Sequence, residues 1–410
     1  MTGCLGCLLS TAALGTRAAD ADSSATTPFE VGVGVHLGLG KSDRARVRSL
    51  LEGGVFTSVR DEVLWSRVER ERGRLAMPGS LAAIDGMLNV DSPALGLRPL
   101  LILDYGNALY GAGLPVTAAQ REAFARYAAF VAARYKDQVA YLEIWNEWNE
   151  GLGSHSRPRI KGSADDYVAL LRVVVPAIRR VAPTVRILAG ATAHIDRRWS
   201  VRMAALGGLD LVDGFSVHPY TYAHTDAVLR RPERAIRGLQ SLERDMRAAA
   251  GRAEAIPFYI TEIGMPHGVA PNHLDEAEVA DYLTRFLLLA RAQPFVRGVW
   301  VYELLDRDVG IRGAESRFGL HDFNGRPREA MLMLRTWLRR LHGASQVSHQ
   351  EDGDYHVVRW RSPDGDRLEA HWSTSGTVAL RGEVGEGNPR NGLPARVGAR
   401  PRFISGGSDS

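Results

Sequence analysis

The feature that most constrains the fold is a repeated unit of short apolar strand, polar or glycine-containing turn and helical pattern. We count eight such units between residues 31 and 342. The predicted strands span residues 31–36, 55–60, 98–104, 139–147, 185–189, 212–217, 257–262 and 298–302. The clearest helical patterns span residues 42–52, 117–135, 163–181, 232–249, 275–291 and 328–341. Strands that alternate with helices in this way predict a parallel sheet covered by helices.

Eight units in series favour one closed barrel over an open doubly wound sheet. We therefore predict the α/β class, with a (β/α)8 TIM barrel over residues 28–342 and a small C-terminal β appendage. No glycine-rich dinucleotide loop follows any strand, because Gly32 and Gly34 lie inside the first strand. We accordingly expect no cofactor.

After His342 the pattern changes from helical to alternating. Residues 355–360 and 367–372 alternate apolar and polar side chains across the turn 363–365, which predicts a hairpin within an appendage of residues 343–382. The remainder, 383–410, is rich in Gly, Pro, Arg and Ser, and this composition predicts a disordered tail.

Residues 1–27 have the composition of a leader. Residues 4–15 are small and apolar, and small residues follow, as in the hydrophobic region of a secretory signal, although no positive charge precedes them. Both cysteines, Cys4 and Cys7, lie here, so a mature chain would have no disulfide. We expect a periplasmic or secreted protein, and the weak lipoprotein-like box at Cys7 leaves a lipid anchor open.

Two function classes find little support in the composition. The net charge of +4 comes from arginines scattered between acidic residues on helical stretches, which indicates solvated helix faces and no nucleic-acid partner. Beyond the leader no apolar run approaches the roughly 18 residues of a membrane span, so we predict no transmembrane helix. With 45% hydrophobic residues the chain can bury a core, and we expect a monomer.

The candidate site comes from the strand ends, because barrel enzymes place their active sites at the carboxyl ends of their strands. The fourth predicted strand ends in Trp145-Asn-Glu-Trp148 and the seventh ends in Glu262. The strand-end side chains are His36, Arg60, Tyr105, Asn107, Asn146, Glu147, Trp148, His218, Tyr220, Glu262, Trp300 and Tyr302. Two carboxyl groups among aromatic rings suit a sugar site, since glycoside hydrolysis uses one carboxyl group as acid and another as nucleophile or base.

These residues also carry a resemblance to a known group. Residues 144–147 (Ile-Trp-Asn-Glu) and 260–262 (Ile-Thr-Glu) resemble the strand-four and strand-seven motifs of glycoside hydrolase clan A. Segments 33–36, 102–107, 218–220 and 318–320 are similar to family 39, with PslG-type hydrolases of biofilm exopolysaccharide as the nearest match. The resemblance implies a retaining hydrolase of O-glycosidic bonds, with Glu147 as acid/base and Glu262 as nucleophile.

The expected roles then follow. Partial desolvation and the charge of Glu262 favour protonated Glu147, whereas Tyr220 and Arg60 favour ionised Glu262. We expect Arg60 to orient Glu262 rather than to touch sugar. Asn146 is expected to hold the 2-hydroxyl of the sugar, and Trp300, which fits the strand-eight aromatic of the clan, is expected to form the floor beneath it. Retention predicts carboxyl groups about 5–5.5 Å apart, and inversion about 6.5 Å or more.

Alternatives remain open at this stage. His36 and His218 are as suited to fixing loops as to binding sugar. Glu143, Glu150 and Asp104 are expected to be structural or rim residues, and no metal is expected because the histidines lack a ligand spacing such as H-E-x-x-H. A polysaccharide or oligosaccharide is the expected partner. A glycan-binding or exopolysaccharide assembly factor without turnover is the alternative function. A cofactor-dependent barrel enzyme finds no support, because no lysine stands at a strand end to form a Schiff base.

Overall fold

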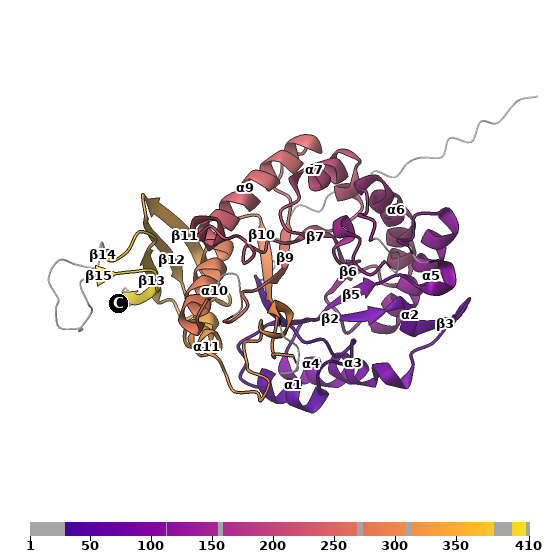
Figure 1. Ribbon diagram of the computed structural model, residues 1–410, viewed down its shortest axis with the longest axis horizontal. Coiled ribbons are helices and arrows are strands. Elements are labelled where there is room, and N and C mark those ends of the chain that lie inside the picture. The colour runs from indigo at the N-terminus through magenta and orange to yellow at the C-terminus, as the bar shows by residue number, and fades with distance from the viewer. Residues whose placement is uncertain are drawn as a thin grey trace, which may run out of the picture.

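The computed structural model describes residues 29–111, 113–154, 159–268, 274–307, 313–380 and 396–406, so the predicted leader lies outside the described residues. Eight parallel strands close into a barrel in the order β1-β10-β9-β8-β7-β6-β5-β2 (Figure 1). The strands are β1 Glu30–Gly34, β2 Ser58–Leu64, β5 Leu100–Asp104, β6 Tyr141–Ile144, β7 Arg186–Ala193, β8 Gly214–His218, β9 Phe258–Ile263 and β10 Val296–Val301. The predicted (β/α)8 barrel is confirmed.

Side-chain caps fix the first residues of four of the six predicted helices, and all six lie in the ring around the strands (Figure 1). They are α1 Arg44–Leu51, α5 Ala118–Tyr135, α6 Ala164–Val181, α9 Pro232–Ala249, α10 Glu276–Arg291 and α11 Glu329–Leu341. Thr117 and Asp275 each form a capping box with the residue three positions later, which satisfies backbone N–H groups at the start of the helix. All six helices begin and end within two residues of the predicted bounds.

The second strand differs from its prediction, because it runs over 58–64 instead of 55–60. Charged residues usually end a strand, yet Arg60, Asp61 and Glu62 are all buried within this one. Asp61 accepts hydrogen bonds from the backbone N–H groups of Leu37 and Gly38, at 2.7 and 2.9 Å. These bonds from the loop after β1 compensate for the buried charge, and the strand continues.

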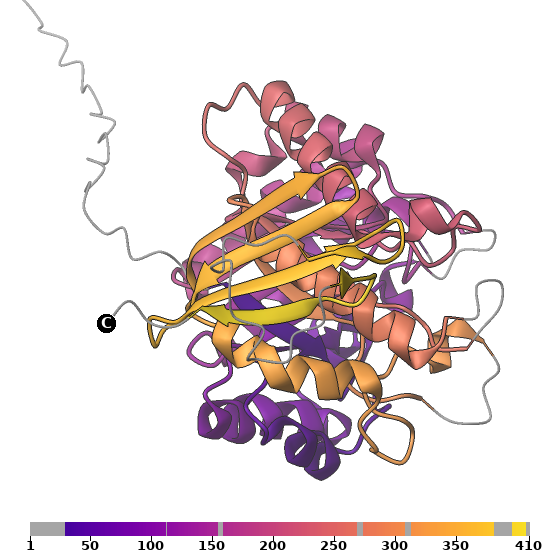
Figure 2. The ribbon, with the colours of Figure 1, turned by 90° about the vertical axis from the view of Figure 1, so that its left-hand side faces the viewer.

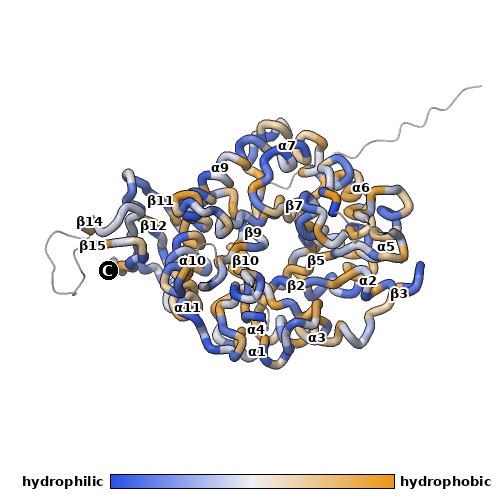
Figure 3. Tube along the Cα trace, in the orientation of Figure 1, coloured by the Kyte–Doolittle hydropathy of each residue, from blue (hydrophilic) through white to orange (hydrophobic). Residues whose placement is uncertain are grey.

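Apolar residues fill the barrel below the site. Leu100, Ile102, Tyr141, Leu188, Tyr259 and Trp300 form one buried cluster from five strands. Glu143 follows Tyr141 by two positions and so points to the same interior face one layer further along. Figure 3 shows apolar and hydrophilic segments interleaved along the surrounding helices, as expected for helices with one face on the strands.

The C-terminal appendage is an antiparallel sheet in the order β11-β12-β13-β16. Its strands are β11 Ser345–Asp352, β12 Tyr355–Arg361, β13 Arg367–Ser373 and β16 Arg402–Gly406, and the predicted hairpin is β12–β13. The sheet lies against the barrel helices (Figure 2). The Trp372 indole donates to Glu233 of α9 at 2.8 Å, and the Trp360 indole donates to the Arg340 carbonyl of α11 at 3.1 Å.

The predicted disordered tail is wrong for part of its length. β16 pairs with β13, and the two-residue strand β15 Arg396–Val397 pairs with β14 Val378–Ala379. The reason is side-chain packing, since Phe403 stacks on Trp337 of α11 at 5.5 Å between ring centroids and Ile404 is buried. Residues 383–395 and 407–410 lie outside the described residues.

Candidate active site

A cavity of about 710 Å³ opens where the barrel strands end. Eight of the twelve predicted strand-end residues line it: His36, Arg60, Tyr105, Asn146, Glu147, Tyr220, Glu262 and Tyr302. Arg60 lies within β2, Glu262 is the last residue but one of β9, and the others follow β1, β5, β6, β8 and β10. The barrel thus gathers on one cavity predicted side chains that are as many as 266 positions apart, from His36 to Tyr302.

Glu262, at the end of β9, is held as an anion. Tyr220 donates its hydroxyl to Oε2 of Glu262 at 2.8 Å, and the Arg60 guanidinium donates to Oε1. Burial alone raises the pKa of a carboxyl group, but the charges of His218 and Arg60 and these two hydrogen bonds outweigh it. They lower the pKa of Glu262 to about 2. Glu262 is therefore ionised at neutral pH, as expected from the sequence.

Arg60 is fixed from below by the barrel interior. Its Nε donates to Glu143 at 2.9 Å, and its Nη2 donates to Oδ1 of Asn146 at 3.0 Å. Burial disfavours its charge, but Glu143 and Glu262 raise its pKa. Arg60 is buried, and its contact with Glu262 is the one expected from the sequence. Its contact with Asn146 is not predicted from the sequence, and Glu143 is its structural partner.

Glu147 lies in the turn after β6, with φ 51° in the left-handed region. A non-glycine residue there is strained by roughly 1–2 kcal/mol. Its backbone N–H donates to the Ala191 carbonyl at 2.9 Å, which helps hold this conformation. Such strain is commonly kept at functional sites. This backbone conformation directs the Glu147 carboxyl group into the cavity, and the Glu147 side chain is 20% exposed.

His218 joins the two glutamates. Its Nδ1 lies 3.0 Å from Oε1 of Glu147 and 3.9 Å from Oε2 of Glu262, while Nε2 lies 3.1 Å from the Thr261 hydroxyl. Burial disfavours the charged imidazole, but the charge of Glu262 and the bond with Glu147 raise the pKa of His218. His218 does not line the cavity; it positions both carboxyl groups from behind.

The separation of the two carboxyl groups decides what they can do together. One oxygen of Glu147 and one oxygen of Glu262 lie within 4.8 Å of each other. Paired carboxyl groups about 5–5.5 Å apart leave room for an anomeric carbon between a nucleophile and an acid, whereas inverting pairs about 6.5–9.5 Å apart also admit a water molecule. A spacing within 4.8 Å for this oxygen pair is compatible with the closer kind.

A second cluster of side chains lies beside the cavity, with His36 between the carboxyl groups of Glu62 and Glu303. His36 Nδ1 lies 3.2 Å from Oε1 of Glu62, and its Nε2 lies 3.2 Å from Oε2 of Glu303. Burial, only partly opposed by His36 and Lys41, raises the pKa of Glu303 to about 8. Glu62 and Glu303 are not among the site residues predicted from the sequence. Their signal was a carboxyl group beside a predicted site residue, two positions after Arg60 and one after Tyr302.

Three predicted contact residues lie elsewhere and are corrections. Asn107 caps a short 3-10 helix and donates to the Glu69 carbonyl at 2.8 Å, so its side chain supports a loop. Trp148 is buried beside Tyr167 and donates to the Ser163 carbonyl. Trp300 is 0% exposed within the barrel, where its indole donates to Ser58 at 2.9 Å, so it cannot be the floor of this cavity.

The aromatic wall is instead built by Tyr220, Tyr222, Tyr302 and Phe318. Tyr302 and Phe318 pack edge to face at 5.2 Å between centroids, and Tyr220 lies 6.4 Å from Tyr302. Asn146 and Tyr105 also line the cavity, and Asn146 donates to the Tyr105 hydroxyl at 2.7 Å, which fixes the orientation of the Asn146 amide. The cavity thus combines aromatic faces, fixed hydrogen-bonding groups and two carboxyl groups.

Comparison with solved structures supports the same fold. No protein-family model and no curated protein matches the sequence. A family 39 glycoside hydrolase from the gut symbiont Bacteroides cellulosilyticus superimposes with a TM-score of 0.72 at 22% identity, covering 92% of this chain and 80% of that one. A GH5_18 protein from Streptomyces cattleya, in complex with GlcNAc, gives a TM-score of 0.61 at 20% identity, covering 76% and 80%.

A monomeric β-xylosidase from Caulobacter crescentus gives a TM-score of 0.59 at 18% identity, over 82% of this chain and 74% of that one. At these identities the likeness establishes the fold. The predicted resemblance to family 39 is confirmed as a structural similarity, and the similarity extends to the GH5_18 protein. Among the described residues no helix is long and apolar enough to cross a membrane. The chain therefore has the barrel of known glycoside hydrolases, with a pair of glutamates where its strands end.

Proposed function

We propose that this protein is a retaining glycoside hydrolase with Glu147 as acid/base and Glu262 as nucleophile. The observation that carries the proposal is the pair itself: two glutamates face one cavity with oxygens within 4.8 Å, and one of them is fixed as an anion. A permanently ionised carboxylate suits attack on an anomeric carbon. Its more exposed partner suits proton transfer to a leaving group and, later, from water.

The reaction would run in two displacements. Glu147 protonates the glycosidic oxygen while Glu262 attacks the anomeric carbon, which gives a covalent glycosyl ester and frees the leaving group. Glu147, now ionised, then takes a proton from water as the water attacks the ester and restores Glu262. Asn146, held between Arg60 and Tyr105, is placed to bind a sugar hydroxyl during both steps.

The substrate class rests on coarser grounds. The carbohydrate follows from the glycosidase fold and the aromatic wall, whereas a bacterial exopolysaccharide, and a periplasmic or secreted location, follow only from the sequence resemblance and the leader-like composition of residues 1–27. We propose both. Incubation with a panel of bacterial exopolysaccharides and aryl glycosides, followed by sizing of the products, tests the substrate and separates chain cleavage from release of terminal sugars.

The two roles are tested by chemical rescue. Glu262→Ala and Glu147→Ala are incubated with an aryl glycoside and sodium azide, and the anomeric form of the product is read by NMR. We expect Glu262→Ala to form a glycosyl azide of inverted configuration, since azide replaces the nucleophile, and Glu147→Ala to form one of retained configuration. The opposite pattern would reverse the assignment. A wild type that binds glycans without cleaving any of them would favour the glycan-binding alternative.

A further inference from the structure

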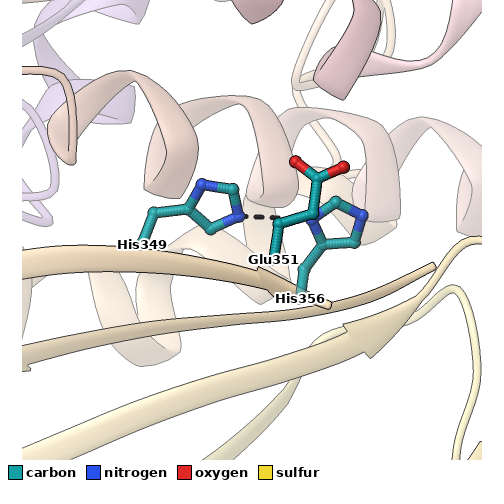
Figure 4. A group of neighbouring side chains, drawn as sticks. All are labelled: His349, Glu351 and His356. Carbon is teal, nitrogen blue, oxygen red and sulfur yellow. Dashed lines mark hydrogen bonds between the residues drawn. The ribbon is translucent and has the colours of Figure 1, made fainter. Parts of the chain in front are cut away.

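A second group of side chains able to bind a metal lies on the appendage, away from the active-site cavity. His349 and Glu351 belong to β11, and His356 lies on β12 directly opposite Glu351. Alternate residues of a strand share a face, and Figure 4 shows all three side chains rising from the sheet toward the barrel helices. His356 is also opposite Trp372 of β13, which contacts Glu233 of α9. The group therefore borders the contact between sheet and barrel.

The spacing of the donor atoms suits one small ion. One donor atom from each of the three residues lies within 4.8 Å of the others. Nε2 of His349 and Nδ1 of His356 are 3.2 Å apart. Two imidazole ligands of tetrahedral zinc, each about 2.0–2.1 Å from the ion, are about 3.3–3.4 Å from one another. The two histidines already have nearly that separation.

The same geometry also forms a hydrogen bond in the absence of an ion. The rings are nearly parallel, at 6°, with centroids 5.4 Å apart, so the two facing nitrogens lie in line and share one proton. An ion would replace this proton. The histidine that carries this proton would change tautomer, so that the proton lies on the second nitrogen of the same ring. Both rings would then turn slightly to direct their lone pairs to the ion. No proton is released and no group is oxidised.

The surroundings hold these ligands and leave access for an ion. The Trp372 ring lies parallel to both imidazoles within 6°, with centroids 5.3 Å from His356 and 6.3 Å from His349, which restricts their rotation. Arg237 of α9 binds Oε1 of Glu351 at 3.1 Å, but a carboxylate has two oxygens and can bind an arginine and an ion together. Glu351 is exposed and His349 is half-buried, so the ion can enter from solvent.

We propose that His349, Glu351 and His356 bind a divalent cation of the zinc class, with water as the fourth ligand. Two imidazoles and one carboxylate are a ligand set that zinc accepts. The ion would tie β11 to β12 beside the contact with α9. No metal is expected from the sequence, because the histidines lack a ligand spacing such as H-E-x-x-H. His349 and His356 are seven positions apart and meet only through strand pairing.

The proposal is tested by calorimetric titration of zinc chloride into chelator-treated full-length protein. We expect one equivalent to bind with a Kd of about 10 μM or tighter, and His349→Ala to weaken binding at least about tenfold. Gln350→Ala is the matched control. Its side chain points to the other face, where it accepts a hydrogen bond from Arg359 at 3.0 Å, so binding should be unchanged.

A second control separates this site from the catalytic pair, because Glu147, His218 and Glu262 also converge closely enough to hold an ion. Glu147→Gln should keep zinc binding. A zinc-soaked crystal should show an anomalous peak about 2.0–2.1 Å from both histidine nitrogens, a readout that needs no folded variant. Absence of binding at about 100 μM zinc, equal affinity in His349→Ala, loss in Glu147→Gln, or a peak elsewhere would overturn the proposal.

Discussion

The ends of β6 and β9 carry the same amino acid in different surroundings. Glu262, at the end of β9, receives hydrogen bonds from Arg60 and Tyr220, and its side chain is 12% exposed. The side chain of Glu147, after β6, has one hydrogen-bonded partner among the described residues, His218, and is 20% exposed. A nucleophile benefits from a fixed charge, whereas an acid/base must exchange a proton in every cycle. The difference between the two sites matches that division.

The largest expected effect comes from the fixed carboxylate. Glu262→Gln removes the attacking oxygen, so kcat should fall by at least about 10⁴-fold for every substrate, whatever its leaving group. Steady-state kinetics on good and poor leaving groups would check this. Glu52→Gln, in an exposed ion pair with Arg48 at the end of α1, is the control and should keep full activity. A Glu262→Gln variant that retains kcat on any substrate would break the comparison.

Glu147, the more exposed of the two glutamates, should behave differently. Glu147→Gln removes proton donation, worth about 10²–10⁴-fold, but only where the leaving group needs a proton. We expect a large loss on oligosaccharides, little loss in the first step with dinitrophenyl glycosides, and a burst followed by slow turnover, since the ester then lacks its base. Stopped-flow kinetics would measure the burst. Equal losses on both substrate types would contradict the role of Glu147 as acid.

Tyr220→Phe sharpens the comparison by removing one support of the Glu262 charge. A hydrogen bond to a charged group contributes about 1.5–3 kcal/mol, so kcat/KM should fall about 10- to 100-fold. The pKa of Glu262 should rise from about 2, which moves the acid limb of the pH–kcat/KM profile upward. The lowered pKa of Glu262 contributes stability at pH values above the pKa that this group has in the unfolded chain, and this stability is lost as the pH falls toward about 2. Tyr220→Phe removes part of it, so acid should unfold the variant at a higher pH than the wild type.

The control for this effect is another tyrosine that donates to a carboxylate. Tyr135 donates to Asp85 at 2.7 Å on the outside of the barrel. Tyr135→Phe should leave the pH profile of kcat/KM unchanged. A shift of similar size in both variants would show that Tyr220 acts through general stability.

The smallest effect on activity concerns the aromatic residues of β10 and the segment after it. Tyr302→Ala should raise KM about fivefold, since an aromatic face contributes on the order of 1 kcal/mol to a sugar contact. Trp300→Phe should leave KM within about twofold and lower the free energy of unfolding by about 1–3 kcal/mol, because the buried Ser58 oxygen loses its indole donor and keeps its own donation to the Arg98 carbonyl at 2.6 Å. A KM change in Trp300→Phe but not in Tyr302→Ala would show that Trp300 contacts the sugar.

This last pair shows where sequence reasoning stops. Trp300 and Tyr302 are two positions apart and therefore face the same way along β10 and its extension. Periodicity thus cannot separate them. The structure does, because Trp300 lies level with Tyr141 and Tyr259 in the filled interior, while Tyr302 lies one layer further along, at the cavity. Depth along a barrel depends on the register with neighbouring strands, which one strand does not contain.

The sequence by itself determined the eight units, the six long helices and the placement of Glu147 and Glu262 where strands end. These are local properties, since side-chain alternation and helix caps act over a few residues. Tertiary structure alone decided which strand-end residues reach the cavity, that β16 joins the appendage, and which contacts lower the pKa of Glu262. Arg60 and Glu262 are 202 positions apart, so the pKa of Glu262 comes from a contact that only the folded barrel makes. Burial and Coulomb interactions depend on distance in space, and alternation depends on distance along the chain.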